Sequence, residues 1–290
     1  MRAVPTVLAL ALTLSMATGC EQQPAGEPIV RTTIRAADGA TQPGSGGPDA
    51  TAAGDLTAQI ESSCRPVIFE DASFTHCLAV PSRHRITTAL AGPDGSPLRE
   101  FAGYAATRRQ GDPPVAFAMN GGMFGEDGQP IGYYVENAER LQTLNTSDAT
   151  GNFYLKPNGV FFGDEDKWQI RTTEDFLQNV ADRPQFGTQS GPMLVIDGKL
   201  HPDIAVDGES RLIRNGVGVD DEGRAHFVIS NAPVSFGKLA RLYRDKLEVD
   251  NALYLDGNVS ALWSPASGRM DSGAPLGPLI VVEKKPAGAG

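Results

Sequence analysis

The chain has 290 residues, a formal net charge of −10 at pH 7 and a pI near 4.9. Such acidity argues against nucleic acid as a partner, because binding phosphates requires a basic face. The four histidines show no metal-ligand spacing, and neither a Gly-x-Ser-x-Gly elbow nor a P-loop occurs, so the sequence predicts no metal site and no cofactor.

The first segment, residues 1–20, has the features of an export signal. Arg2 precedes an apolar stretch of signal-peptide length, which is too short to span a bilayer as a mature helix. The small residues 17–19 lead into Cys20, a pattern that resembles the lipobox of bacterial lipoproteins, except that Ala17 replaces the usual leucine. We therefore expect a bacterial cell-envelope protein whose Cys20 carries lipid and anchors it to a membrane. The alternative is an ordinary signal peptide whose last residue happens to be cysteine.

A linker and one domain are predicted to follow. Residues 21–60 are rich in Gly, Ala, Pro and Thr, so they cannot bury a core, and we expect a flexible tether with a reach of roughly 35 Å. Residues 61–285 have the length of one domain with a sizeable core, and no repeat divides them. Cys64 and Cys77 are an even pair that an oxidising compartment would join as a disulfide, with two free thiols as the alternative.

The predicted strands lie between turn-forming residues. The segments "RPVIFE", "FTHCLAVP" and "RITTALAGPDGSPLREF" read as strands, with a turn from Pro93 to Ser96 in the third. The apolar run Val115–Met119 is typical of a strand buried on both faces. "GPMLVIDGKL" predicts a hairpin around Asp197-Gly198, and "IRNGVGVDDEGRAHFVIS" predicts two strands joined by a turn. Leu253–Leu255 reads as a further short strand.

Two helices are predicted. In "TTEDFLQNVADRP", Thr172 and Asp175 form a capping-box pattern, with Phe176, Leu177 and Val180 on one face. In "VSFGKLARLYRDKLEVD", four apolar residues recur at helical spacing. These residues are Phe236, Leu239, Tyr243 and Leu247. Many strands with few helices predict a single α+β domain with a mixed β-sheet core flanked by a few helices.

Polar residues and glycines follow several of the predicted strands. Glycine allows backbone amides to approach a ligand, so loops of this kind are candidate parts of a shared site, although any one of them alone is more often a structural turn. The four loops are Asn120-Gly121-Gly122, Gln189-Ser190-Gly191, Arg214-Asn215 and Asp256 with Ser260. Arg214 suits a phosphate or a carboxylate, and the open alternative is a buried ion pair with Asp220, Asp221 or Asp256. Asp256-Gly257 is either the start of a site or a hairpin turn.

Five of these motifs together resemble the phosphodiester glycosidase family. They are "FAMNGGMF", "GNFYLKPNGVFF", "TQSGPMLVIDGKLHP", "RNGVGVD" and "NALYLDGNVSALW", in order from about residue 116 to residue 282. The resemblance implies a hydrolase that cleaves a sugar from a phosphodiester. Where the animal branch of the family resembles Asp-Gly-Gly-Gly-Ser, this chain has Asp256-Gly257-Asn258-Val259-Ser260, so two glycines are lost and substrate access is expected to differ.

The implied chemistry gives each candidate residue an expected role. Arg214 is expected to neutralise the departing phosphate, helped by Ser190 and by the amides of Gly121, Gly122 and Gly191. Asp256 is expected to assist at the anomeric carbon. The remaining candidates are expected to bind substrate or phosphate; they are Asn120, Gln189, Asn215 and Ser260, with Glu136 as a weaker second carboxylate.

Three functional interpretations remain open at the level of sequence. The first is a lipid-anchored hydrolase acting on a phosphorylated or phosphodiester-linked glycan of the envelope. The second is a lipoprotein that binds such a glycan without turning it over. The third is a structural envelope protein whose polar loops satisfy one another, which the absence of a cavity near Asp256 and Arg214 would favour.

Overall fold

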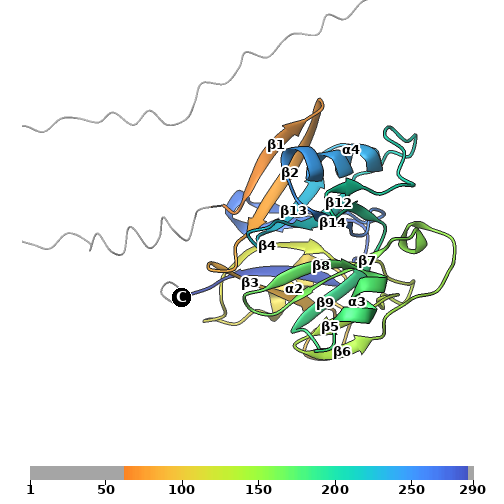
Figure 1. Cartoon of the computed structure of the whole chain (residues 1–290). Helices are drawn as coiled ribbons and strands as arrows, with labels where there is room; N and C mark the ends of the chain where they lie inside the picture. Colours follow the sequence, from red (N-terminus) through yellow and green to blue (C-terminus); the bar gives the residue numbers. More distant parts are fainter. Residues whose placement is uncertain (1–61, 287–290) are drawn as a thin grey trace, which may run out of the picture. The chain divides into compact units, whose positions relative to one another are not determined.

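The computed structural model describes residues 62–286, which fall within one compact unit (Figure 1). The predicted signal segment, the lipidation site Cys20 and the predicted linker lie outside the described residues. No helix within residues 62–286 combines the length and the apolar character needed to cross a bilayer.

The largest sheet has seven strands in the order β1-β2-β13-β12-β14-β10-β11. Its strands are β1 (Cys64–Phe69), β2 (Ala72–Ala79), β10 (Met193–Ile196), β11 (Lys199–Leu200), β12 (Asn215–Val219), β13 (Ala225–Ser230) and β14 (Asn251–Tyr254). The turn between β10 and β11 places Asp197 and Gly198 at positive φ (46° and 73°), as the predicted hairpin requires. The predicted strand pair β12 and β13 is likewise confirmed.

Two five-stranded sheets complete the fold. The second sheet contains, in order, β16 (Arg269–Met270), β15 (Leu262–Ser264), β4 (Val115–Asn120), β17 (Leu279–Lys284) and β3 (His84–Ala89). The third contains, in order, β6 (Glu139–Gln142), β5 (Tyr134–Glu136), β9 (Phe186–Ser190), β7 (Gly159–Gly163) and β8 (Trp168–Thr172). The α+β class is therefore confirmed, while the expected mixed sheet is three sheets whose strand pairings, within the described residues, are all antiparallel.

The helical elements are short. They are α2 (Phe101–Thr107), α3 (Thr173–Asn179), α4 (Phe236–Arg241), the π-helix η2 (Leu242–Lys246) that continues α4, and the 3-10 turns η1 (Asn152–Tyr154) and η3 (Pro265–Ser267). The predicted cap of α3 is confirmed, because the Thr172 hydroxyl accepts a hydrogen bond from the amide of Asp175 (3.1 Å). Ser235 caps α4 in the same way through the amide of Lys238.

The core lies between the three sheets. The ring of Phe227 on β13 is 5.3 Å from that of Phe117 on β4 and 5.8 Å from that of Phe161 on β7. The next residue, Val228, points to the opposite face of the seven-stranded sheet, where it packs in a cluster with Tyr243. Helix α4 covers that opposite face, as Figure 1 shows. One apolar core thus joins all three sheets and fixes the strand ends that carry the polar loops.

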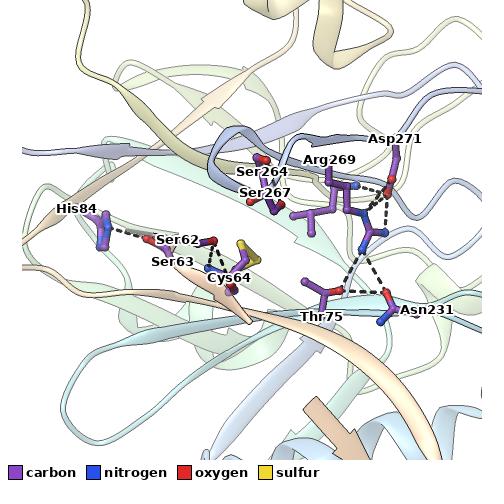
Figure 2. Close-up of a disulfide and its surroundings, with 12 residues drawn as sticks. Ser62, Ser63, Cys64, Thr75, His84, Asn231, Ser264, Ser267, Arg269 and Asp271 are labelled. Atoms are coloured by element: carbon purple, nitrogen blue, oxygen red, sulfur yellow. Dashed lines mark hydrogen bonds and ion pairs between the residues drawn. A yellow bond between two sulfur atoms is a disulfide. The ribbon is translucent and has the colours of Figure 1, made fainter. Parts of the chain in front are cut away.

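The predicted disulfide joins Cys64 to Cys77, which are opposite residues of the β1–β2 pair. Figure 2 shows its surroundings. Close to it, the guanidinium of Arg269 donates to the Thr75 hydroxyl (3.1 Å) and to the side-chain oxygen of Asn231 (3.2 Å), as the dashed lines show. The disulfide therefore closes the edge hairpin, and Arg269 ties the second sheet to it.

One local prediction is wrong, and one of two open alternatives is excluded. Leu177 does not share the buried face of Phe176, because its side chain is 63% exposed on α3. Asp256-Gly257 is not a hairpin turn, because β14 belongs to the seven-stranded sheet whereas the next strand, β15, belongs to the second sheet. Neither residue has the positive φ of such a turn. The segment is instead a crossing between sheets.

Candidate functional site

Asp256 lies where the chain leaves β14 and crosses toward β15. Its side chain is mostly buried, with the residue 7% exposed, and its Oδ1 accepts a hydrogen bond from the amide of Asn258 (3.0 Å). Burial raises the pKa of Asp256, and the hydrogen bond from Asn258 opposes part of that shift. A carboxylate placed in this way keeps one oxygen free of protein partners and is poorly solvated, which strengthens its interaction with a positive charge.

Three other predicted residues form hydrogen bonds with the Asp256 segment or with one another. The Asn120 amide nitrogen donates to the backbone carbonyl of Asp256 (3.1 Å), and its Oδ1 accepts from Asn215 Nδ2 and from the amide of Ala261, both at 2.8 Å. The Ser260 hydroxyl lies 3.3 Å from Asn215 Oδ1. Asn120 and Asn215 are fully buried. The structure thus brings four predicted residues together, with Asn120 and Asn215 holding the backbone on which Asp256 is carried.

Arg214 is one of the largest fully buried side chains within residues 62–286. Its guanidinium donates to the carbonyl of Val234 (2.9 Å), to the carbonyl and hydroxyl of Ser210 (both 3.0 Å) and to the Tyr254 hydroxyl (3.1 Å). It also lies 3.6 Å from the centre of the Phe236 ring. No carboxylate in the described part of the chain pairs with it, so the ion pair with Asp220, Asp221 or Asp256 is wrong. Burial lowers the pKa of Arg214, and the Tyr254 hydroxyl opposes that shift.

Tyr254 connects Arg214 to the Asp256 segment. A Cβ added to Gly257 would lie 1.3 Å from the Tyr254 hydroxyl, so that hydroxyl fills the space beneath the glycine. Burial raises the pKa of Tyr254 to about 12, although the charge of Arg214 opposes the rise. The hydroxyl therefore stays protonated at neutral pH, and Gly257 is required by close approach rather than by its φ.

The predicted loop at Gln189 lies near this cluster but is internally satisfied. Gln189 Oε1 accepts from the amides of Tyr133 and Asn145 (both 2.9 Å), while Ser190 donates to the carbonyl of Leu255 (3.1 Å). These contacts fix the third sheet against the end of β14. They leave Gln189 buried and without an exposed polar atom, so its contribution is to hold neighbouring loops in place.

The glycines of the candidate site also make structural contacts. The amide of Gly121 donates to the carbonyl of Pro278 (2.7 Å), and that of Gly122 donates to the Thr188 hydroxyl (3.0 Å). Contrary to prediction, these two amides are not available to an anion. A Cβ on Gly191 would lie 2.6 Å from a backbone carbonyl oxygen, so this position needs glycine for close packing.

Glu136 is not part of the cluster. It lies on β5, where its Oε2 accepts from the amide of Leu90 (3.0 Å) and from the Tyr134 hydroxyl (2.9 Å). Burial raises the pKa of Glu136, and these two hydrogen bonds oppose the rise. The contact with Leu90 ties β5 to the residue that follows β3, and the contact with Tyr134 lies within β5, so protein partners account for this carboxylate without a ligand.

Two cavities adjoin the crossing segment, and Gly257 and Asn258 line both. The smaller has a volume of about 320 Å³. It is lined by Met123, Ile131, Thr150, Gly151, Asn152, Phe153, Tyr154, Asp256, Gly257 and Asn258. Asp256 is its one carboxylate, and the aromatic residues of η1 form part of the wall. A cavity of this volume that combines aromatic side chains with polar groups is typical of a small-molecule site.

The larger cavity, of about 600 Å³, shares Gly257 and Asn258 with the smaller one and is also lined by Arg99 and Arg211. Neither arginine was predicted as a site residue, nor was Tyr154 in the smaller cavity. Arg99 precedes α2 and Arg211 precedes β12, and no local pattern marks either of them. Arg214 lines neither cavity. Within residues 62–286, no three His, Cys, Asp or Glu side chains are grouped in a way that could hold a metal ion.

A family model described as phosphodiester glycosidase matches residues 114–282. The chain belongs to the phosphodiester glycosidase family. The predicted resemblance from about residue 116 to residue 282 is thus confirmed. The chain is 37% identical to the uncharacterized protein YigE of Escherichia coli (strain K12) over 171 residues. These residues are 59% of this chain and 66% of that relative, just under two thirds of its length.

Solved structures with low sequence identity share the fold of this phosphodiester glycosidase family member. One is the zebrafish N-acetylglucosamine-1-phosphodiester alpha-N-acetylglucosaminidase catalytic domain auto-inhibited by pro-peptide, with a TM-score of 0.52 and 14% identity over 77% of this chain and 82% of that one. Another is a putative exported protein from Burkholderia pseudomallei K96243, with a TM-score of 0.50 and 11% identity over 73% and 74%. At such identities the likeness establishes the fold alone.

Proposed function

We propose that this family member hydrolyses a sugar 1-phosphodiester and releases the sugar. In the reaction, the oxygen of water bonds to the anomeric carbon, and the bond between that carbon and the phosphate oxygen breaks. The bonding electron pair leaves with the phosphomonoester, and the water proton passes to a base. Because a phosphomonoester is a weakly basic leaving group, stabilising charge at the sugar and at the phosphate matters more than a strong general acid.

The position of Asp256 is the observation that carries this proposal. Asp256 lines the smaller cavity, and one of its carboxylate oxygens accepts a hydrogen bond from the amide of Asn258. The residue is otherwise buried. In this proposal, a sugar in the smaller cavity has its anomeric carbon near Asn258, which lines both cavities, and its phosphate in the larger cavity. The ionised Asp256 then stabilises the positive charge that develops at the anomeric carbon.

Arg214 and Asn120 act in this proposal as positioning residues. Asn120 holds the backbone carbonyl of Asp256, and Arg214 holds the Tyr254 hydroxyl beneath Gly257. A buried guanidinium without a carboxylate partner is costly to the folded state. Its charge lies next to the crossing segment, where it lowers the energy of the departing phosphate without touching it.

The full chain, incubated with a panel of sugar 1-phosphodiesters while free reducing sugar is measured, tests the proposal. We expect release from at least one member of the panel. Asp256→Asn is expected to lower the rate by about 10²-fold or more, the usual size of such effects. Asp182→Asn, an exposed carboxylate outside both cavities, is the matched control and should retain the parent rate.

Arg214→Lys separates a positioning role from mere packing. If the charge matters, Arg214→Lys keeps more of kcat than Arg214→Met at equal thermal stability. Full activity of Asp256→Asn would remove Asp256 from the mechanism. Binding of the panel without any release would instead support the second interpretation, a lipoprotein that holds a phosphorylated glycan.

We also propose that the enzyme works at the bacterial cell envelope, lipid-anchored at Cys20. The lipobox-like residues before Cys20 support this location, and a disulfide between Cys64 and Cys77 suits an oxidising compartment. Cys20→Ala should move the protein from the membrane fraction to the soluble fraction. Retention of the variant in the membrane fraction would exclude Cys20 as the anchor.

A further inference from the structure

The larger cavity has a composition that the sugar chemistry alone does not explain. Four separate segments line it: Leu98–Glu100, Arg211–Ile213, 257–261 and 271–276, together with Pro233. The first precedes α2, the second precedes β12, and the third is the crossing segment itself. Its volume of about 600 Å³ is nearly twice that of the cavity beside Asp256, which is about 320 Å³. The larger cavity therefore has room for a group bigger than the sugar proposed for the smaller cavity.

Two of the charged residues that line this cavity, Arg99 and Arg211, could bind an anion. Arg99 lies over the Phe124 ring at 5.4 Å, and no carboxylate among residues 62–286 pairs with it. Arg211 pairs with Asp207 (2.8 Å), but both side chains are largely exposed, so this pair contributes little and is easily exchanged. Of the two acidic lining residues, Asp271 is neutralised by Arg269 (2.7 Å), and Glu100 is exposed.

The remaining wall is largely apolar and partly open to solvent. Leu212 and Ile213 are 40% and 44% exposed, which is unusual for adjacent large apolar residues that end a loop. Val259 packs against a buried cluster that includes Leu98 and Leu276, and all three line the cavity. Exposed apolar surface that continues into a cavity marks a binding groove more often than an ordinary surface. A second sugar would leave this wall without a partner, whereas a hydrocarbon would bury it.

We propose that the larger cavity takes the leaving phosphate together with an apolar aglycone. The substrate is then a sugar 1-phosphodiester of a hydrocarbon alcohol, with Arg99 and Arg211 at the phosphate and with Ile213 and Val259 against the chain. The placement of the phosphate in this cavity rests on the proposed function. Val259 occupies a position where the resemblance to the animal branch of the family implies glycine, so the apolar wall here differs from that branch.

Binding of sugar-free phosphodiesters tests the inference separately from catalysis. The full chain is titrated with methyl octyl phosphate and with dimethyl phosphate, followed by amide chemical shifts below the aggregation concentration of the longer ester. We expect the octyl ester to bind at least about 10-fold more tightly, because burying a few methylene groups suffices for that ratio. Equal affinity of the two esters would overturn the proposal.

Variants of the two walls assign the effect to this cavity. Ile213→Ser and Val259→Gly should each reduce the 10-fold preference to about 3-fold or less, on the same area scaling. Arg99→Ala combined with Arg211→Ala should weaken both esters. Leu141→Ser, at an exposed leucine on β6 outside the cavity, is the matched control and should keep the full preference. A preference that survives both wall variants would place the hydrocarbon elsewhere and contradict the proposal.

Hydrolysis of matched substrates distinguishes the two proposals from each other. With one sugar held constant, the octyl phosphodiester should have a kcat/KM at least about 10-fold above that of the methyl phosphodiester. Release from both at equal kcat/KM, together with equal affinity for the two sugar-free esters, would keep the proposed function and overturn the apolar aglycone. A clear preference in binding with no release from either would do the reverse.

Discussion

At the scale of the single residue, Asp256 shows a conflict between chemistry and stability. Burial raises its pKa, so in the window between the unfolded and folded values the folded state holds more protons than the unfolded state. The free energy of unfolding therefore falls as pH rises through that window. Asp256→Asn removes the buried charge while its oxygen still accepts from the amide of Asn258. We expect the variant to be more stable than the parent at pH 7, as measured by urea unfolding.

The pH dependence makes this prediction specific. Below the unfolded-state pKa of Asp, near 3.9, both forms are neutral and the stability difference should shrink toward zero. Asp182→Asn, whose carboxylate is exposed, should show no stability gain at either pH. A variant that is less stable than the parent at pH 7 would mean that the hydrogen bond from Asn258 outweighs the cost of burial.

At the scale of the element, local signals predicted more of the fold than of the site. The Thr172 cap, the Asp197-Gly198 turn and the buried strand at Val115 each depend on residues close in sequence, and the structure confirms them. The prediction that Leu177 lies on the buried face was wrong, because the pattern of a seven-residue helix does not specify how wide its buried face is. The alternative of a hairpin at Asp256 could not be excluded from the sequence, because distant partners determine which sheet receives the next strand.

The site itself depends on contacts that sequence does not show. The convergence of Asn120, Asn215 and Asp256 joins strands of two sheets. The polar loops after the predicted strands pointed to all three residues, but their hydrogen bonds to one another could not be predicted from the sequence. The charge of Arg214 suggested an anionic partner, yet its guanidinium donates instead to the Tyr254 hydroxyl and to backbone carbonyls. Arg99 carries no local signal, because its importance comes only from the cavity it lines.

The β1–β2 hairpin gives the element-scale prediction. Strand β1 is an edge strand, and the disulfide closes a loop with a sequence separation of 13 residues. Its reduction should lower the free energy of unfolding by up to about 3 kcal/mol in the chain-entropy model. Because neither cysteine lines a cavity of the site, sugar release at low temperature should persist. Urea unfolding with and without reductant measures the first effect, and activity lost together with stability would contradict the second.

At the scale of the whole molecule, all four histidines are buried in the folded protein. Burial lowers the pKa of His76 to about 3 and that of His84 to about 4, and it also lowers the pKa values of His201 and His226. For His226, the carboxylate of Asp220 opposes the shift. The Nδ1 of His84 accepts a hydrogen bond from the amide of Val80 (3.0 Å), and a proton on that nitrogen would remove the acceptor.

These histidines should make the protein sensitive to acid. Between pH 6.5 and the folded-state pKa values of about 3 for His76 and about 4 for His84, the unfolded chain binds more protons than the folded chain. The free energy of unfolding should therefore fall as the pH is lowered from 7 to 4. This slope is opposite in sign to that of Asp256 and Glu136, whose pKa values burial raises, and the four histidines outnumber these two carboxylates. His84→Asn keeps an acceptor for Val80 without a basic nitrogen, so it should flatten the slope. The four imidazole resonances should all titrate below pH 6.5, and a resonance with an unshifted pKa would remove that histidine from the acid response.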